Sequence, residues 1–199
     1  MQIQKNSRQI PKVKSITSHK EYSDLMYGYL QSISFREEET NRRFVNAKDV
    51  SFTKLGNELK ISRQTAAKRF KNLINLGLVV EYPKEKVYEL PALIRTDAFL
   101  IPKSTLEQLV YSLHDNSVSV YIYFVNRFFA NKEQPFIFTL STLKGYCGLS
   151  TNTKSNNQII TYILKTLEKL KLIKYSCQTT NVSNEIKTQY TLESVELIV

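Results

Sequence analysis

Apolar residues in the first half of the chain recur at the spacing of a helix. A first amphipathic helix is predicted over about 21–33, and residues 36–44 are a candidate extension of it. Leu55 and Leu59 are four residues apart and predict a short second helix with one apolar face. The apolar spacing therefore predicts two separate helices before residue 60.

A third helix and a hairpin are predicted directly afterwards. Ser62 is a good N-cap because its hydroxyl can accept from the unpaired amides of the next turn, so residues 63–76 are expected to be helical. Gly77 is a suitable left-handed C-cap. Residues 78–82 and 86–90 are expected to be strands that flank a turn with a proline. The predicted order is helix, turn, helix, hairpin.

The second half of the chain repeats this order. We expect helices at 103–114 and 118–129, a strand at 136–139, a short helix at 140–147 and a long helix that ends at Leu172. A second hairpin is expected over 173–177 and 186–192, with a longer polar connection than the first.

An ungapped alignment supports the repeat. When Ser62 is placed on Ser150, Leu55 falls on Leu143 and Ile61 falls on Leu149. Beyond this point the second copy needs about six extra residues within 151–157, and Lys171 stands where the first copy has Gly77. Such a repeat indicates a duplicated function.

These elements predict a mostly helical α+β protein with small hairpins, built from two tandem winged helix-turn-helix domains. The expected organisation is a basic N-terminal arm at 1–20, a first domain at 21–92, a linker at 93–102 and a second domain at 103–199.

Composition narrows the class of function. The 199 residues have a formal net charge of +10, which favours polyanionic partners. Because no apolar stretch is long enough to form a signal peptide or a membrane span, a cytoplasmic protein is expected. His19 and His114 lie far apart, Cys147 and Cys177 show no metal-binding spacing, and no nucleotide or nucleophile motif occurs. We therefore expect no catalytic activity, no metal and no cofactor.

Candidate DNA-binding residues of the first copy lie on its second helix and near its hairpin tip. An α-helix fits the major groove, where Gln can pair with adenine and Arg with guanine, while Lys neutralises phosphates. No acidic residue occurs from Lys60 to Leu78. The predicted contacts are Arg63, Gln64, Thr65, Lys68, Arg69, Lys71, Lys84 and Lys86.

The second copy offers an amide-rich and weakly charged surface at the start of its long helix. Such side chains form directional hydrogen bonds with base edges but release few counterions. The predicted contacts are Lys154, Asn156, Asn157, Gln158 and Thr161. We expect the first copy to supply most of the affinity and the second to add sequence discrimination.

The pattern from Leu55 to Tyr88 resembles the winged-helix DNA-binding domains of bacterial regulators, which have core and turn residues at positions such as Leu59, Phe70 and Gly77. The tandem arrangement is similar to plasmid and phage replication initiators and regulators. This resemblance implies a sequence-specific binder of double-stranded DNA that regulates transcription. The alternatives are a replication initiator that binds origin repeats and, in another class, an adaptor whose winged helices dock proteins.

The segment from Val118 to Phe129 is apolar around nearly its whole circumference. A helix of that kind must be covered on every side. Either the first domain or a second chain can provide this cover, and we expect a homodimer through this segment.

Overall fold

The computed structural model describes residues 7–11, 23–93, 98–182 and 185–197. The chain divides into two compact units, of which the first comprises Met1–Asp115 with Ile198–Val199 and the second comprises Asn116–Leu197. Each unit is a mixture of helices and small antiparallel sheets, so the predicted α+β class is confirmed.

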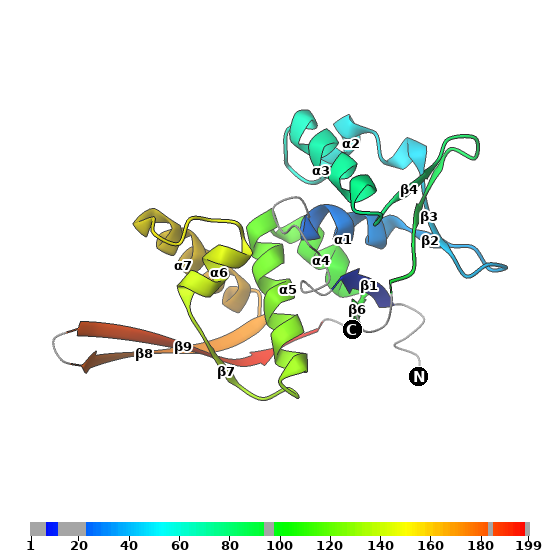
Figure 1. The fold of residues 1–199 in the computed structure, drawn as a ribbon. Coiled ribbons are helices and arrows are strands. Elements are labelled where there is room, and N and C mark those ends of the chain that lie inside the picture. Colours follow the sequence, from blue (N-terminus) through cyan, green and yellow to red (C-terminus); the bar gives the residue numbers. More distant parts are fainter. Residues whose placement is uncertain (1–6, 12–22, 94–97, 183–184, 198–199) are drawn as a thin grey trace. The chain divides into compact units, whose positions relative to one another are not determined.

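The first unit begins with strand β1 and continues through helices and short strands to α4 (Figure 1). Its elements are β1 (Ser7–Pro11), α1 (Asp24–Ile33), β2 (Phe35–Arg36), β3 (Arg43–Asn46), the 3-10 helix η3 (Ala47–Asp49), α2 (Phe52–Glu58), α3 (Arg63–Asn75), β4 (Val80–Tyr82), β5 (Val87–Leu90), β6 (Ala98–Pro102) and α4 (Lys103–Ser112).

The described residues of this unit form two antiparallel sheets. The four-stranded sheet has the order β2-β3-β5-β4, so β3 pairs with β5 rather than with the next strand along the chain. The two-stranded sheet pairs β1 with β6, and Gln9 lies opposite Leu100. The β4–β5 hairpin therefore lies at one edge of the larger sheet.

Helix α1 is central to the core of the first unit. Every residue from Asp24 to Ser32 is buried, which requires cover on all sides of the helix. Helix α4 supplies part of that cover: a Cβ added at Gly28 would lie 3.6 Å from a methyl of Leu106 and 3.7 Å from one of Val110. The glycine thus lets the two helices approach closely.

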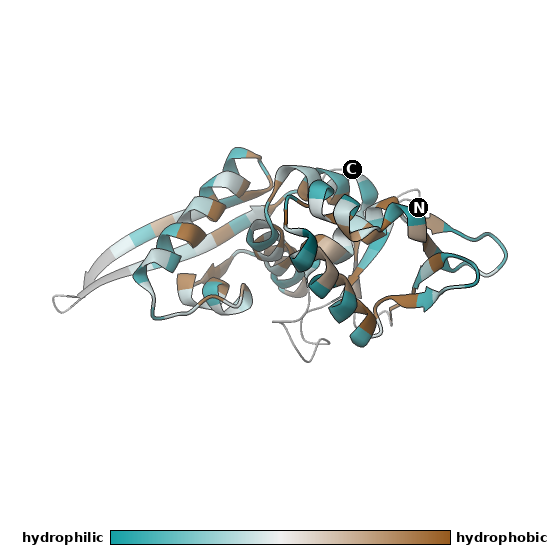
Figure 2. Cartoon of the chain, turned by 90° about the horizontal axis from the view of Figure 1, so that it is seen from above, coloured by the Kyte–Doolittle hydropathy of each residue, from teal (hydrophilic) through white to brown (hydrophobic). Residues whose placement is uncertain are grey.

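The described residues of the second unit form three helices and three strands. They are α5 (Asp115–Ala130), which starts at the last residue of the first unit, β7 (Phe136–Phe138), α6 (Leu140–Tyr146), α7 (Lys154–Lys169), β8 (Ile173–Val182) and β9 (Glu185–Val195). The sheet order is β7-β9-β8. Figure 2 shows hydrophilic and hydrophobic residues alternating along the helices, as burial of one face requires.

Apart from β2 and η3 in the first unit, the same succession of elements occurs in both units: helix, strand, helix, helix, strand, strand. In the first unit it is α1, β3, α2, α3, β4 and β5, and in the second α5, β7, α6, α7, β8 and β9. In each succession the first strand pairs with the third, and the third pairs with the second. Helices α2 and α6 begin and end at positions that the ungapped alignment makes equivalent.

Two predicted features differ in the structure. Residues 36–44 do not extend the first helix, because the chain is extended at Ser34 and β2 pairs with β3. The rings of Phe35 and Phe44 pack at 6.1 Å across that pairing. The second hairpin is longer than predicted, since β8 and β9 pair from Ile173 to Val182.

The predicted domain boundary also differs. Residues 7–11, predicted to be part of a basic arm, and residues 98–102, predicted to be part of a linker, are paired strands, and α4 belongs to the first unit. The rest of the predicted arm, 1–6 and 12–20, and positions 94–97 of the linker lie outside the described residues. Among the described helices, none has the length and apolar character needed to cross a membrane.

Candidate nucleic-acid interface

A tight turn joins α2 to α3. The hydroxyl of Ser51 caps α2 by accepting from the amide of Lys54, and that of Ser62 caps α3 by accepting from the amide of Thr65 at 3.1 Å. A Cβ at Gly56 would lie 2.9 Å from the carbonyl oxygen of Ile61, closer than side chains tolerate. The turn therefore requires glycine at this position, and α3 starts close against α2.

Helix α3 has one buried and one exposed face. Ala66, Phe70 and Leu73 are buried. The opposite face exposes side chains at intervals of four, three and four residues, which align along a helix. These are Gln64, Lys68, Lys71 and Asn75. This α3 face therefore presents two ammonium groups and two amides.

Three other predicted contacts on α3 have different surroundings. Arg63 is exposed at the first position of the helix. Thr65 is half-buried, and its hydroxyl lies 2.8 Å from that of Ser62. Arg69 forms an ion pair with Asp115 at 2.6 Å, and the other carboxylate oxygen of Asp115 accepts from Ser23 at 3.0 Å. Because the Arg69 guanidinium has an internal partner, its predicted role as a phosphate anchor is the weakest of this group.

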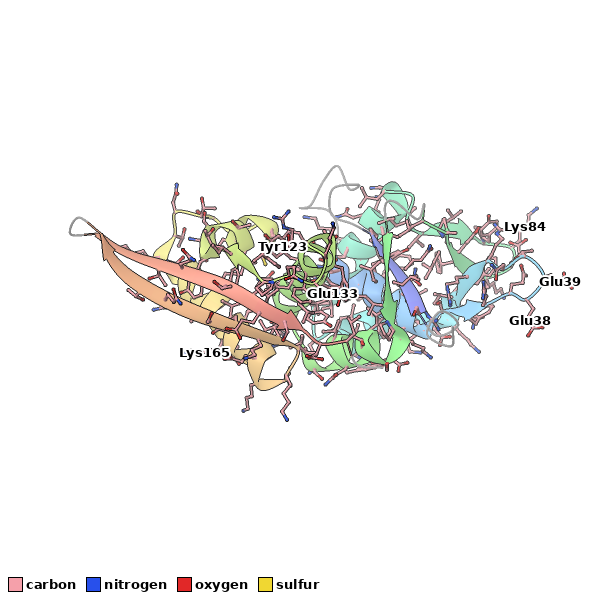
Figure 3. The ribbon with its side chains drawn as sticks, turned by 90° about the horizontal axis from the view of Figure 1, so that it is seen from below. Glu38, Glu39, Lys84, Tyr123, Glu133 and Lys165 are labelled. Atoms are coloured by element: carbon pink, nitrogen blue, oxygen red, sulfur yellow. The ribbon has the colours of Figure 1, made fainter. Side chains whose placement is uncertain are left out.

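The β4–β5 hairpin places two further predicted contacts near its tip. Lys84 and Lys86 are exposed, and Figure 3 shows Lys84 at the end of the hairpin. Lys86 has a φ of 53°, and its carbonyl accepts from the amide of Ala47 at 2.9 Å. The ring of Tyr88 packs edge-on against Phe70 at 5.0 Å. These contacts fix the hairpin against α3 and against η3, which precedes α2.

An ion pair holds the base of the same hairpin. The Arg42 guanidinium donates to the carboxylate of Glu89 on β5, which also accepts from the Tyr82 hydroxyl on β4 at 2.9 Å. The hydrogen bond from Arg42 holds the pKa of the Glu89 carboxyl below its ordinary value. A carboxylate that stays ionised thus links the two strands with the residue before β3.

In the second unit, α7 places the predicted contacts unequally. Lys154 and Gln158 are exposed, while Asn157 and Thr161 are half-buried. The side-chain amide of Asn156 donates to the carbonyl of Ser150 at 2.9 Å. Asn156 thus closes the loop before the helix, and Gln158 is the best placed of the predicted amides.

The outward face of α7 continues beyond those residues. Tyr162 is 70% exposed and Ile159 is 42% exposed. Lys165, labelled in Figure 3, and Lys169 are also exposed and lie seven and eleven residues after Gln158. Helical spacing from Gln158 would have identified both lysines, whereas the prediction stopped at the first two turns.

The extra residues before α7 are held by a buried lysine. Lys144 is 4% exposed, and its ammonium group donates to the carbonyl of Thr151. Lys144 is the alignment partner of Gly56, so the second turn holds a long side chain where the first admits only hydrogen. The inserted loop accommodates this change by supplying the carbonyl.

No group of three or more His, Cys, Asp or Glu side chains capable of holding a metal occurs in the part of the chain that the structure describes. Comparisons with known proteins add no assignment. No family model matches the chain, and no curated protein and no solved structure matches it.

Proposed function

We propose that the protein is a sequence-specific binder of double-stranded DNA that acts as a transcriptional regulator and consists of two tandem winged-helix domains. The order of elements in each unit, with its sheet of first, third and second strand, is the order of a winged helix. In that fold the second helix of the helix pair enters the major groove. Those helices are α3 and α7 here, and the β4–β5 and β8–β9 hairpins are the wings.

The observation that carries the proposal is the α3 face. It follows a capped turn, exposes Lys68 and Lys71 beside Gln64, and belongs to a stretch without acidic residues. Lysines of this kind neutralise phosphates, while an amide can pair with the edge of adenine. Lys165 and Lys169 extend the same chemistry to α7, which carries more charge than the sequence interpretation gave it.

The test is the salt dependence of binding to duplex DNA. Replacing Lys68 and Lys71 with alanine should weaken binding to cognate and random duplexes alike and lower the slope of log affinity against log salt by up to about two. Lys48→Ala is the matched control, because Lys48 is an exposed lysine of the same unit outside the α3 face. An unchanged slope in the double variant would rule out the α3 face as the electrostatic contact.

Genome-wide footprinting separates the regulatory role from its alternatives. Binding at promoters supports transcriptional control, and binding at repeated origin sites supports replication initiation. A protein-docking adaptor predicts no DNA sites.

Helix α5 leaves little exposed apolar surface for the homodimer expected through residues 118–129. Of the residues from Val118 to Phe129, seven apolar side chains are buried in the single chain, while Phe129 is 41% exposed. The ring of Tyr123 is half-buried and packs against Tyr146 at 5.1 Å. A dimer through α5 would thus depend on Phe129, and sedimentation equilibrium of the wild type and of Phe129→Glu tests it.

A further inference from the structure

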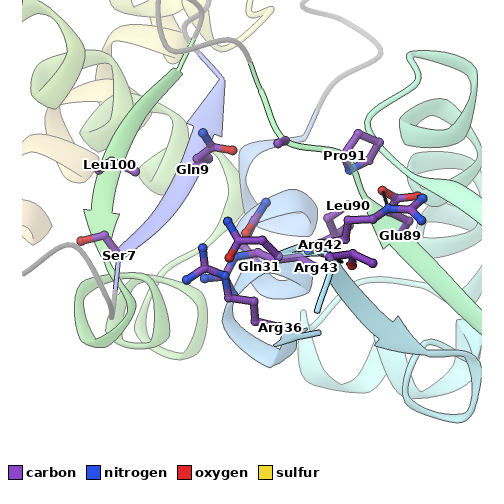
Figure 4. Close-up of a pocket in the computed structure, with 13 residues that line it drawn as sticks. Ser7, Gln9, Gln31, Arg36, Arg42, Arg43, Glu89, Leu90, Pro91 and Leu100 are labelled. Atoms are coloured by element: carbon purple, nitrogen blue, oxygen red, sulfur yellow. Dashed lines mark hydrogen bonds and ion pairs between the residues drawn. The ribbon is translucent and has the colours of Figure 1, made fainter. Parts of the chain in front are cut away.

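A pocket of about 410 Å³ lies in the first unit between β1, the end of α1 and the β2–β3 hairpin (Figure 4). This volume falls in the range of about 300–1,000 Å³ that small-molecule sites occupy. Three arginines line it: Arg36, Arg42 and Arg43. Glu89 is the acidic residue among the lining side chains.

The charge of the pocket is unbalanced. Arg42 is already paired with Glu89. Arg36 and Arg43 form no ion pair with any carboxylate in the described residues, and the Arg43 guanidinium donates to the Ser34 hydroxyl at 3.3 Å. Burial, reinforced by the nearby charges of Arg8 and Arg36, lowers the pKa of Arg43 to about 10. Two guanidinium groups therefore repel each other without a counter-charge.

A buried arginine, Arg8, lies near these guanidinium groups. Arg8 is 7% exposed, and its guanidinium donates to the carbonyls of Gln31 at 2.9 Å and Ser7 at 3.2 Å. It too has no ion-pair partner among the residues that the structure describes. Arg8 is buried and Arg43 is half-buried, and holding these like charges near each other costs free energy. The attraction of Glu107 offsets part of this cost at Arg8, and a bound anion would offset more.

The remaining walls suit an organic ligand better than a bare ion. Gln31 is 2% exposed, and its side-chain oxygen has no hydrogen-bond partner in the described residues, although its amide donates to the Tyr27 hydroxyl. Leu90 and Leu100 add apolar surface to the pocket. The pocket thus combines free positive charge, an unused acceptor and apolar walls.

We infer that this pocket binds a small organic phosphate, with its phosphate group on Arg36 and Arg43. A phosphate monoester carries a charge of about −1.5 to −2, which matches two uncompensated guanidinium groups, whereas a single carboxylate matches one. Guanidinium groups bind such oxyanions through paired hydrogen bonds. This inference does not depend on DNA binding, since all the residues that carry it line or support the pocket of the first unit.

Isothermal titration calorimetry at fixed ionic strength, without DNA, tests the inference on the full chain. The probes are ADP, inorganic pyrophosphate and succinate. ADP should bind more tightly than succinate, and Arg36→Ala should weaken ADP binding at least tenfold. Arg36 is exposed, so this variant is expected to fold, and Arg36→Lys should recover part of the affinity by restoring charge without the paired geometry.

Lys48→Ala is again the control and should bind ADP as the wild type does. Pyrophosphate binding as tight as that of ADP would support a phosphate site but would show that the pocket does not recognise the organic part of the ligand. Succinate binding as tight as that of ADP, or ADP binding unchanged in Arg36→Ala, would overturn the inference. If ADP fails to bind while Arg36→Ala weakens binding to a duplex, the arginines contact DNA phosphates instead and the pocket is not a ligand site.

Discussion

Lys171 adopts the left-handed backbone conformation, with a φ of 57°, at the position after α7 that Gly77 occupies after α3 with a φ of 69°. In both units the next amide donates to a carbonyl five residues earlier at 3.0 Å. The turns before these helices show the reverse exchange, because Lys60 has a φ of 54° where Gly148 has a φ of 68°. The repeat thus preserves the backbone conformation while glycine and lysine change places.

Gly77→Ala should lower the free energy of unfolding by about 1 kcal/mol, because a Cβ disfavours a left-handed residue. Lys171→Gly should change it by less than about 0.5 kcal/mol, since relief of the same strain is offset by greater freedom of the unfolded chain. Urea unfolding measures both. Gly145→Ala is the control: Gly145 is helical with open space around it, so alanine should stabilise by about 0.5 kcal/mol. A Gly77→Ala variant as stable as the wild type would contradict the strain argument.

Arg69 should contribute to stability rather than to DNA affinity. Arg69→Ala breaks its pair with Asp115, in which both side chains are about three-quarters buried, and is expected to cost about 1 kcal/mol in urea unfolding. The salt slope of DNA binding should change much less than in the variant lacking Lys68 and Lys71. A double-mutant cycle with Asp115→Asn isolates the pair, and a coupling energy near zero would show that it does not stabilise the unit.

Gln158 and Asn156 should separate sequence reading from loop structure. Gln158→Ala removes an exposed amide and should cost about 1–3 kcal/mol on cognate DNA if it pairs with a base, with little effect on random DNA. Asn156→Ala removes the hydrogen bond to Ser150 and should lower thermal stability instead. Equal losses on cognate and random DNA for Gln158→Ala would show that α7 does not read sequence.

Glu89 should make stability depend on acidic pH. In the folded state, the hydrogen bond from Arg42 lowers the pKa of the Glu89 carboxyl below its ordinary value of 4.5. The folded state therefore favours the ionised carboxylate. This stability is present above about pH 4.5 and is lost as pH falls through the folded pKa. Glu89→Gln should therefore be less stable than the wild type at pH 7, and the difference should shrink in acid. Glu85→Gln, at an exposed turn position of the same hairpin, should match the wild type at pH 7.

The helical pairs could be predicted because their signals are local. Apolar spacing and the cap at Ser62 lie within a few turns of each other, and the predicted bounds of α3 and α6 agree closely with the structure. The pairing of β1 with β6 could not be predicted from local signals, because Gln9 and Leu100 are about 90 residues apart in the sequence. A basic run without acidic residues is typical of a tail, and only tertiary pairing makes it a strand.

The residues of the candidate site also divide into those that local sequence predicts and those that it does not. Exposure of Gln64 and Lys68 follows from helical geometry once Phe70 is placed in the core. The partner of Arg69 does not follow, since Asp115 lies on an element much later in the chain. Residues 36–44 differ from a candidate helix extension for a related reason, because Phe44 packs against Tyr82, which lies far along the chain, and this packing overrides local helix preference.

The length of the β8–β9 hairpin has a consequence for how the second unit opens. Each strand spans at least ten residues, or about 33 Å, yet β7 pairs only with residues 190–192 of β9. Outward of Tyr190, pairs such as Gln178 with Gln189 have no third strand beside them among the described residues. Because isolated two-stranded ribbons are marginally stable, amide hydrogen exchange should be graded along the hairpin. Protection should be highest near Leu192 and fall at Gln189, so that the outer ribbon can open and close while the rest of the unit stays folded.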